Sequence, residues 1–477
     1  MFEYSLSELA QVTSGTISGG DPSDTVSGFF VDSRECIPGG VFVAIPGERV
    51  DGHTFLTDVK DAGAALAIIN HSFTGSIPEG LAVISVSDSV KALGQIAHWT
   101  RVTKLHAKVV GITGSSGKTT TKDFIAGILE QCGPTSYARG SFNTEVGLPL
   151  TIVSADAETR FLVLEMGMRG VGHIETLANI AVPDVGVVTN VGSAHIGLLG
   201  SLENIAQAKG ELIRSLGTQS VAVLNADDPR VSDMAAATAA SVVTFGERSD
   251  ATFRASEIKV DSDGSASYTL HHAGETFEVE LQIPGEHQVS NSLAAIAACS
   301  AVGIEVGRAV ELIGRVERIS KWRMEVVQLD NGVTIINDSY NANPESMRAA
   351  LKTLANMARG RRSIAVLGPM KELGDQTMVE HDALGRLAVR LDISRLLCVG
   401  DEMKVTHLGA SQEGSWGEES QWVSDVDAAL EYLGHNIAPG DVVLVKASRS
   451  VGLDRVAQAL ISGEISKVSD DQPEGVS

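Results

Sequence analysis

The stretch "VVGITGSSGKTTTKDFIAGILE" (109–130) decides how the middle of the chain is expected to fold. An apolar run ends in a turn rich in glycine and serine, reaches Lys118, and continues into a helical pattern. Backbone N–H groups at the start of such a helix face an anion, and glycine lets the chain approach it without a Cβ clash. Strand, turn, lysine and helix in this order predict a phosphate-binding loop for ATP or GTP.

This loop departs from the usual pattern GxxxxGK[ST], which needs glycine at position 112, where Ile112 stands. Glycine occurs at 111 and 114 instead, but the strand before and the helix after argue against an accidental turn. We expect Lys118 to meet the outer phosphates and the Thr119 hydroxyl to bind Mg²⁺. The predicted nucleotide-binding residues of the loop are Gly114, Ser115, Ser116, Gly117, Lys118, Thr119 and Thr120.

Composition excludes several classes of protein. The net charge of −23 and the aromatic content of 4% argue against a sequence-independent nucleic-acid binder, which needs a basic surface and stacking side chains. The four cysteines form no CxxC pair, so we expect neither a zinc ribbon nor a disulfide framework. The start lacks a signal-peptide pattern, and the longest uncharged stretch (185–202) is broken by polar residues. A cytoplasmic monomer without a membrane span is the expectation.

A chain of 477 residues is too long to fold around a single hydrophobic core, so two to four domains are expected. In the middle of the chain, the apolar runs "KVVGIT", "FLVLEMG", "VGVVTNVG" and "VAVLNADD" alternate with helical segments, which predicts a buried parallel sheet. We predict an α/β fold of three domains and a disordered acidic tail. Their ranges are 1–106, 107–319 (central, ATP-binding), 320–463 (C-terminal, Rossmann-like) and 464–477 (tail).

Two turns mark antiparallel pieces within this α/β pattern. Residues of alternating polarity flank Asp263-Gly264 inside the central domain, so we expect an antiparallel insert there. Asn331-Gly332 lies between "RMEVVQLD" and "VTIIND" and predicts a hairpin at the start of the third domain. Buried strands such as "SIAVLGPM", "RLLCVG" and "DVVLVKAS" then follow.

The phosphate loop "GITGSSGKTTTK" resembles that of the Mur ligases, which build the peptide stem of the bacterial cell wall. Further stretches resemble the same family in the same order, over nearly the whole chain. They are "DSRECIPGGVFVAIPGERVDGHTFL", "SFNTEVGLPLT", "LEMGMRGVGHI", "TNVGSAHIGLLGS", "IAQAKGELI", "GEHQVSNSLAAIAA", "RMEVV" and "NDSYNANPESM". The resemblance implies that residues 1–106 bind a UDP-sugar-peptide and that 107–319 form the catalytic core.

Within the family, "FNTEVGLP", "SYNANP" and "VKASRS" are similar to members that join D-alanyl-D-alanine to UDP-N-acetylmuramoyl-tripeptide. The implied activity is an ATP-dependent ligase that forms a C–N bond through an acyl phosphate and yields the pentapeptide precursor of peptidoglycan. Such a reaction crowds three anions together, which requires cations and a water-poor site. The chain departs from the family at His173, where Glu is frequent, and at Thr144, where a second Asn is frequent.

Four residues form the predicted catalytic set together with two Mg²⁺ sites. Glu165 ends an apolar strand, where a carboxylate is costly unless it binds a metal or a cation. His195 lies in a glycine-flanked turn, and Lys209 lies in a helical pattern. The resemblance makes Thr119 and Glu165 magnesium ligands, His195 a ligand of the second magnesium, and Lys209 a further ligand once CO₂ has carbamylated it. Lys118 completes the catalytic set. Taken alone, Glu165 could be a salt-bridged strand end, His195 structural and Lys209 a solvated side chain.

The remaining nucleotide contacts rest on the resemblance as well. It places Asn291 near the adenine, Arg323 near the phosphates and Asp338 near the ribose. Without it, Asn291 reads equally well as a helix cap, and Arg323 with Asp338 as an exposed ion pair.

Substrate contacts are predicted in three places. Ser33 and Arg34 are candidates for the diphosphate of the UDP-sugar-peptide, since a diphosphate favours arginine and small hydroxyl donors, although a structural turn explains them equally. Asn143 and Thr144 are expected to contact the sugar-peptide. The loop "KASRS" (446–450) is a candidate for the carboxylate of the dipeptide.

Two classes of alternative remain. Another amide ligase of the superfamily, either the tripeptide-forming Mur ligase or a folylpolyglutamate synthase-like enzyme, would use the same ATP chemistry. A folate enzyme should lack the first domain, and the tripeptide-forming ligase should differ where "SYNANP" stands. A nucleotide-switched regulator or motor would need no set of Glu165, His195 and Lys209. The sequence does not distinguish lysine from diaminopimelate at the third stem position.

Overall fold

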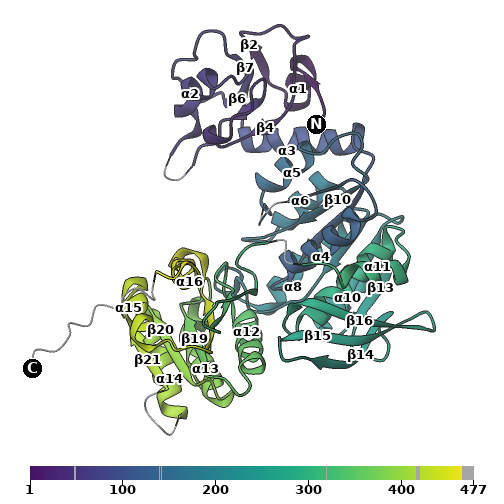
Figure 1. The fold of residues 1–477 in the computed structure, drawn as a ribbon. Helices are drawn as coiled ribbons and strands as arrows, with labels where there is room; N and C mark the ends of the chain where they lie inside the picture. Colours follow the sequence, from purple (N-terminus) through teal and green to yellow (C-terminus); the bar gives the residue numbers. More distant parts are fainter. Residues whose placement is uncertain (48–49, 139, 141, 318–319, 415–418, 465–477) are drawn as a thin grey trace, which may run out of the picture.

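The computed structural model describes residues 1–464, apart from 48–49, 139, 141, 318–319 and 415–418. Three large β-sheets with their helices follow one another along the described residues, from the N-terminal part through the central part to the C-terminal part (Figure 1). The predicted tail lies outside the described residues from position 465 onward. None of the helices in the described ranges is long and apolar enough to cross a membrane.

The N-terminal part is built on a five-stranded sheet in the order β2-β7-β6-β5-β4. Its strands are β2 (Thr16–Ser18), β4 (Phe29–Phe30), β5 (Val41–Val43), β6 (Leu66–Asn70) and β7 (Ala82–Val86). A short pair, β1 (Tyr4–Ser5) with β3 (Thr25–Val26), and the helices α1 (Leu6–Thr13) and α2 (Leu56–Asp61) complete it. Helix α3 (Ser89–Thr103) leaves the sheet and packs on α5 (Gly147–Val153) and α6 (His173–Ala181), so it joins this part to the next.

The central part is a nine-stranded sheet in the order β16-β15-β14-β13-β12-β11-β8-β10-β9. Its strands are β8 (Lys108–Thr113), β9 (Thr135–Tyr137), β10 (Phe161–Glu165), β11 (Val185–Val188), β12 (Val221–Asn225), β13 (Ser241–Gly246), β14 (Phe253–Val260), β15 (Ser265–His272) and β16 (Glu275–Pro284). The strands from β9 to β14 are parallel, whereas β15 and β16 are antiparallel to their neighbours. The predicted antiparallel insert is therefore confirmed, and it extends the parallel sheet at one edge.

Helices cover both faces of this central sheet because its strands are apolar on both sides. Val110 and Ile112 of β8 pack into a core with α4 (Lys118–Glu130), α10 (Gln288–Ala301) and α11 (Val306–Ile313). Val109, on the opposite side of the pleat, packs with α5, α6 and α8 (Leu202–Arg214). The short helices α7 (Ile196–Leu199) and α9 (Pro229–Ser232) lie in the connections after β11 and β12.

The C-terminal part is a six-stranded sheet in the order β17-β18-β22-β19-β20-β21. Its strands are β17 (Glu325–Gln328), β18 (Thr334–Asn337), β19 (Ser363–Leu367), β20 (Arg395–Val399), β21 (Ser420–Val423) and β22 (Val442–Lys446), and its helices are α12 (Pro344–Met357), α13 (Thr377–Arg390), α14 (Lys404–Glu413), α15 (Val426–Asn436) and α16 (Asp454–Ser462). Among the described strands of this sheet, only the β17–β18 pair is antiparallel, and Gly332 in its turn has φ of +83°. The predicted hairpin and parallel sheet are confirmed.

The two larger sheets point the carboxyl ends of their strands at one shared space. The loops after β8, β10 and β11 approach it from the central part, and the loops after β18, β19 and β22 approach it from the C-terminal part. Parallel α/β sheets bind their ligands at this edge. The fold therefore predicts one composite site between the two parts.

Candidate active site

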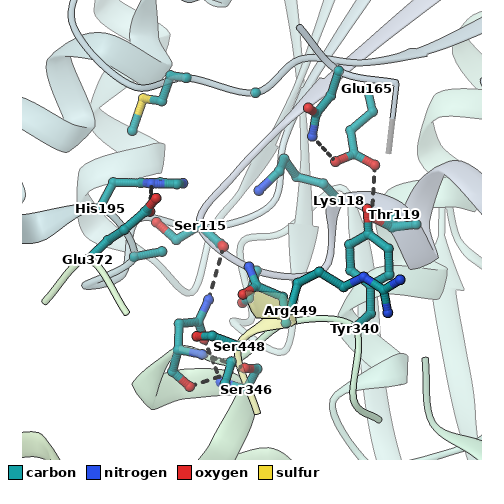
Figure 2. Close-up of a pocket in the computed structure, with 18 of the residues that line it drawn as sticks. Ser115, Lys118, Thr119, Glu165, His195, Tyr340, Ser346, Glu372, Ser448 and Arg449 are labelled. Atoms are coloured by element: carbon teal, nitrogen blue, oxygen red, sulfur yellow. Dashed lines mark hydrogen bonds and ion pairs between the residues drawn. The ribbon is translucent and has the colours of Figure 1, made fainter. Parts of the chain in front are cut away.

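The composite site is a cavity of about 720 Å³ that is lined by both parts of the chain. The central part contributes the phosphate loop, Asn143 to Glu145, the end of β10, and the turn at His195. The C-terminal part contributes Arg323, residues 340–343, Ser346, Lys371, Glu372 and residues 448–450. Figure 2 shows these side chains converging on the cavity from both sides.

The phosphate loop lies between β8 and α4, as predicted. The position in it that requires glycine is 114. Gly114 has φ of +154°, and a Cβ there would lie 1.8 Å from Oγ1 of Thr189. Ile112, where the usual pattern has glycine, is buried inside β8 and needs no such freedom. Nζ of Lys118 donates to the carbonyl oxygen of Gly114 at 2.6 Å, which folds the lysine back over the loop. Burial lowers the pKa of Lys118.

The turn after β11 supports the phosphate loop, and sequence reasoning did not anticipate this contact. The backbone N–H of Ser116 donates to Oδ1 of Asn190 at 3.0 Å, and the Thr189 hydroxyl donates to the carbonyl oxygen of Ser116 at 2.7 Å. The Ser115 hydroxyl donates to the carbonyl oxygen of Gly192 at 3.0 Å. Two loops that are about 75 residues apart in sequence therefore hold one conformation together.

Glu165 and Thr119 meet at the base of the cavity. The Thr119 hydroxyl donates to Oε2 of Glu165 at 2.8 Å, and Nδ2 of Asn143 donates to Oε1 at 2.8 Å. Glu165 is only 2% exposed, and no ion pair holds it among the described residues, so it is not a salt-bridged strand end. Nη2 of Arg323 donates to Oγ1 of Thr119 at 3.3 Å, which brings a cation close to the pair.

The oxygen ligands of this pair suit Mg²⁺. No group of three or more His, Cys, Asp and Glu side chains within the described ranges could hold a metal ion alone. Mg²⁺ does not need such a group, because it keeps several waters and binds through one or two carboxylates together with substrate phosphates. The Thr119 hydroxyl and the Glu165 carboxylate, directly beside the phosphate loop, fit this mode of binding.

His195 lies on the opposite side of Lys118 from Glu165 in the view of Figure 2. It lines the cavity, and its backbone has φ of +67°, which is unusual for a residue with a side chain. Glu372 of the C-terminal part places Oε2 at 2.5 Å from its Nδ1. The contact with His195 lowers the pKa of Glu372.

Lys209 of α8 is buried to 1% exposure and does not line the cavity. Burial lowers the pKa of its amine well below the ordinary value, and the nearby charge of Lys118 acts in the same direction. The alternative of a solvated helix lysine is therefore wrong. A buried lysine amine of this kind is neutral far more often than an exposed one.

The C-terminal wall differs from its predicted arrangement. The guanidinium of Arg323 stacks on the ring of Tyr340 at 4.2 Å and lines the cavity. Asp338 is buried instead of forming an exposed pair with Arg323, and its Oδ2 lies 2.5 Å from Nζ of Lys446. Lys446 is thus held inside the domain and does not face a dipeptide carboxylate. Only Ser448, Arg449 and Ser450 of the predicted loop reach the cavity.

Asn291 packs beneath the phosphate loop and does not line the cavity. Its Oδ1 would lie 2.3 Å from a Cβ on Gly117, which explains why glycine with φ of +79° stands there. Its Nδ2 donates to Oε1 of Gln288 at 2.8 Å. Because α10 begins at Gln288, Asn291 lies within the helix and is not its cap.

Ser33 and Arg34 lie in the N-terminal part, away from the cavity. They form a short 3-10 helix (Ser33–Glu35), in which Arg34 pairs with the capping Asp32 at 2.5 Å. Arg34 is fully exposed, and its contact lowers the pKa of Asp32 to about 2. Thr144, in contrast, lines the cavity beside Asn143.

Several cavity residues were missed by sequence reasoning, all in the loops after the predicted strands or in the first turn of the helix that follows. They are Arg169, Tyr340, Asn341, Asn343, Ser346, Lys371 and Glu372. Asn343 also links the two parts, since its Nδ2 donates to the carbonyl oxygen of Ser115 at 3.3 Å. The signal that could have found them is their position after apolar strands, because such loops gather at one edge of a parallel sheet.

Comparison with known proteins identifies the family. The Mur ligase middle domain matches residues 112–299, the glutamate ligase domain of Mur ligases matches 322–449, and the Mur ligase family catalytic domain matches 25–100. The UDP-N-acetylmuramoyl-tripeptide--D-alanyl-D-alanine ligase of Mycobacterium tuberculosis is 39% identical over 97% of this chain and 99% of its own length. The ligase of that name from Bacillus subtilis is 33% identical over 98% and 100%.

Solved structures agree with the sequence comparison. A crystal structure of MurF from Acinetobacter baumannii has a TM-score of 0.86 and 30% identity, and it covers 97% of this chain and 99% of its own. MurF ligase from Thermotoga maritima, in complex with ADP, has a TM-score of 0.79 and 29% identity over 93% and 98%. The predicted family and three-domain fold are confirmed: the chain belongs to the Mur ligase family.

Proposed function

We propose that the chain is the ATP-dependent ligase that joins D-alanyl-D-alanine to UDP-N-acetylmuramoyl-tripeptide, giving the pentapeptide precursor of peptidoglycan with ADP and phosphate. The observation that carries the proposal is one cavity in which the phosphate loop, Glu165 and His195 meet loops of the C-terminal part. Full-length relatives that bear the name of this activity support the choice of substrates. The crystal structure of a relative in complex with ADP supports the nucleotide.

The chain's own residues divide the work between phosphate, carboxylate and amine. Lys118 and Arg323 supply fixed positive charge where the γ-phosphate is transferred, and the loop amides orient it. Phosphoryl transfer to the tripeptide carboxylate gives an acyl phosphate, which the dipeptide amine attacks as phosphate leaves. Arg169, Lys371 and Arg449 on the cavity wall are candidates for binding the dipeptide carboxylate.

Thr119 and Glu165 would hold one Mg²⁺, and His195 with Lys209 would hold a second. Bound there, the metal supplies neutralising charge for the crowded anions. Asn143 keeps the Glu165 carboxylate oriented by its hydrogen bond. Ser33 and Arg34 remain candidates for the UDP diphosphate, Asn143 and Thr144 for the sugar-peptide, and Asn291 and Asp338 for the adenosine moiety. A cytoplasmic monomer remains a prediction.

A coupled assay tests the proposed reaction. We expect release of phosphate from ATP only when UDP-N-acetylmuramoyl-tripeptide and D-alanyl-D-alanine are both present, with a product whose mass equals that of the joined substrates. Tripeptides that carry lysine or diaminopimelate at the third position decide which acceptor is preferred. Phosphate release with glutamate and folate, or with the dipeptide precursor and a single amino acid, would favour the other ligases. Release without any acceptor would favour a regulator.

Carbamylation of Lys209 is a separate part of the proposal, supported by its burial and lowered pKa. CO₂ reacts with the neutral amine, so the fully buried Lys209 is suited to it. With ¹³CO₂ we expect one carbamate carbon signal that Lys209→Ala removes and that Lys259→Ala, at an exposed lysine on β14 of the central sheet, retains. We also expect Lys209→Ala to lose roughly 100-fold in kcat and a short-chain carboxylic acid to restore part of it. Full activity of Lys209→Ala would reject the role.

A further inference from the structure

Glu372 touches the predicted metal-site histidine from the other side of the cavity. His195 follows β11 in the central sheet, whereas Glu372 follows β19 in the C-terminal sheet. Oε2 of Glu372 lies 2.5 Å from Nδ1 of His195, within ion-pair distance. Figure 2 shows the two side chains meeting at the cavity wall. One domain thus holds the imidazole that the other domain carries.

The backbones of the two loops are shaped for this contact. The N–H of Gly197 donates to the carbonyl oxygen of Glu372 at 2.9 Å. A Cβ on Gly197 would lie 2.5 Å from the backbone nitrogen of Gly374, so no side chain fits at this crossing. His195 and Glu372 both adopt left-handed backbone conformations, with φ of +67° and +65°. Non-glycine residues keep such strain only where surrounding contacts hold it, and here it lies directly at the contact.

In an imidazole, the hydrogen-bond partner of one ring nitrogen decides whether the other nitrogen carries a proton or offers a lone pair. The carboxylate at Nδ1 favours a proton on that nitrogen and leaves the lone pair of Nε2 free. In the described part of the chain, no ion pair occupies Nε2. A carboxylate behind the ring also orients the imidazole and increases its strength as a ligand.

From this contact we infer that Glu372 is a positioning residue, which presents Nε2 of His195 to the second metal site only when the C-terminal part has approached the central part. Closure around the substrates and completion of the metal site then become one event. Lys371, the preceding residue, forms its ion pair with Glu402 and not with the Glu372 carboxylate. The inference rests on the proposed function in one respect, the assignment of His195 to a metal site.

The test follows the His195 ring itself, so it needs no catalytic turnover. In protein with ¹⁵N-labelled histidine, His195→Gln assigns its resonances among those of the 12 histidines. We expect the native ring to be protonated at Nδ1, and Glu372→Ala to shift the tautomer population toward Nε2–H. Glu372→Gln should retain part of the native tautomer population, because the amide oxygen of glutamine can still accept a hydrogen bond from Nδ1–H of His195. Asp375→Ala, which removes an exposed carboxylate from the same turn, should leave the ring unchanged.

Titration of Mg²⁺ in the presence of ADP, followed by the same resonances, supplies the second readout. We expect Glu372→Ala to raise the half-saturating Mg²⁺ concentration about 10-fold or more, whereas Asp375→Ala should not change it. Glu372→Gly, which also relieves the left-handed backbone, should behave like the alanine variant, and so separates the carboxylate from backbone strain. An unchanged tautomer or an unchanged Mg²⁺ titration in Glu372→Ala would overturn the inference. Failure of the native protein to use the proposed substrates would count against the proposed function alone.

Discussion

The two walls of the cavity are built in different ways. The central wall is made by one sheet and the helix that follows its strand β8: Lys118 bonds to its own loop, and Thr119 at the start of α4 bonds to Glu165 at the end of the neighbouring strand β10. The C-terminal wall is assembled from Arg323, which precedes β17, and from loops after β18, β19 and β22, and its charges are spread over several contacts. Arg323 reaches Thr119, Asn343 reaches Ser115, and Glu372 reaches His195.

This difference suggests that the central wall binds ATP, whereas the C-terminal wall completes the site once the substrates are bound. A wall formed by one sheet is in place before substrate arrives, so it is suited to hold ATP. A wall that exists only where two domains meet can complete the site after loading and exclude the water that would hydrolyse an acyl phosphate. Substitutions should therefore have different effects in the central wall, in the C-terminal wall, at the contact between the two walls, and at sites outside both walls.

Lys118→Met should have the largest effect and should break the central wall alone. Removal of a fixed cation from a transferring phosphoryl group lowers kcat by roughly 1000-fold. The native far-UV circular dichroism should persist, because Lys118 contacts its own loop. Lys259→Met, at an exposed position of the same sheet, is the control. Near-native phosphate release by Lys118→Met would contradict the central role of this loop.

Lys446→Met should break the C-terminal wall through its fold. The substitution leaves Asp338 buried without its cation, which costs about 3 kcal/mol of unfolding free energy. Denaturant unfolding measures this loss, and Lys352→Met, at an exposed lysine of α12, should change it little. A stable variant with only a raised KM for the dipeptide would mean that Lys446 serves the substrate after all.

Asn343 tests the contact between the walls. Its Oδ1 accepts from the N–H of Ser346 at the start of α12, and its Nδ2 donates to Ser115. Asn343→Ala loses both and should cost about 1 kcal/mol of stability. Asn343→Asp keeps the cap but not the donor, so it should remain stable while kcat/KM for ATP falls about 5-fold. Equal kinetics for the aspartate variant and the native protein would show that this contact does not assist closure.

Arg34→Ala should have the smallest effect, because Arg34 lies outside both walls. Arg34 is exposed and its ion pair with Asp32 is screened by solvent, so we expect no measurable change in Tm. If Arg34 binds the UDP diphosphate, the KM for the tripeptide substrate should rise several-fold while the KM for ATP stays constant. Lys91→Ala, at another exposed pair of the N-terminal part, is the matched control. An unchanged KM would assign Arg34 to the turn only.

The central wall was the more predictable of the two because its residues follow directly from local patterns. Glu165 was predicted at the end of an apolar run, and the structure places it at the end of β10 beside the phosphate loop. The contact between Thr189 and Gly114 was not predictable, because a close approach between two loops leaves no periodic signal. The roles of these residues in binding ATP, metal and substrate remain predictions.

The predictions from sequence failed where a charged residue pairs with another residue that is distant along the chain. Asp338 and Lys446 are 108 positions apart and were given separate roles, yet they neutralise each other inside the C-terminal part. Glu372 carries no motif that distinguishes it from a solvated charge on a loop. A charged side chain acquires its role from what lies opposite, and only the folded chain supplies that.

By itself, the sequence determined the alternation of apolar strands and helices, the glycine-rich phosphate loop, and through its motifs the family, because these depend on residues that are close together along the chain. Tertiary structure alone decided which charges face the cavity, which neutralise each other in the core, and which domain supplies the partner of His195. The physical reason is that the energy of a charged side chain depends on its distance from other charges and on its burial. Neither quantity is set by the residues next to it in the sequence.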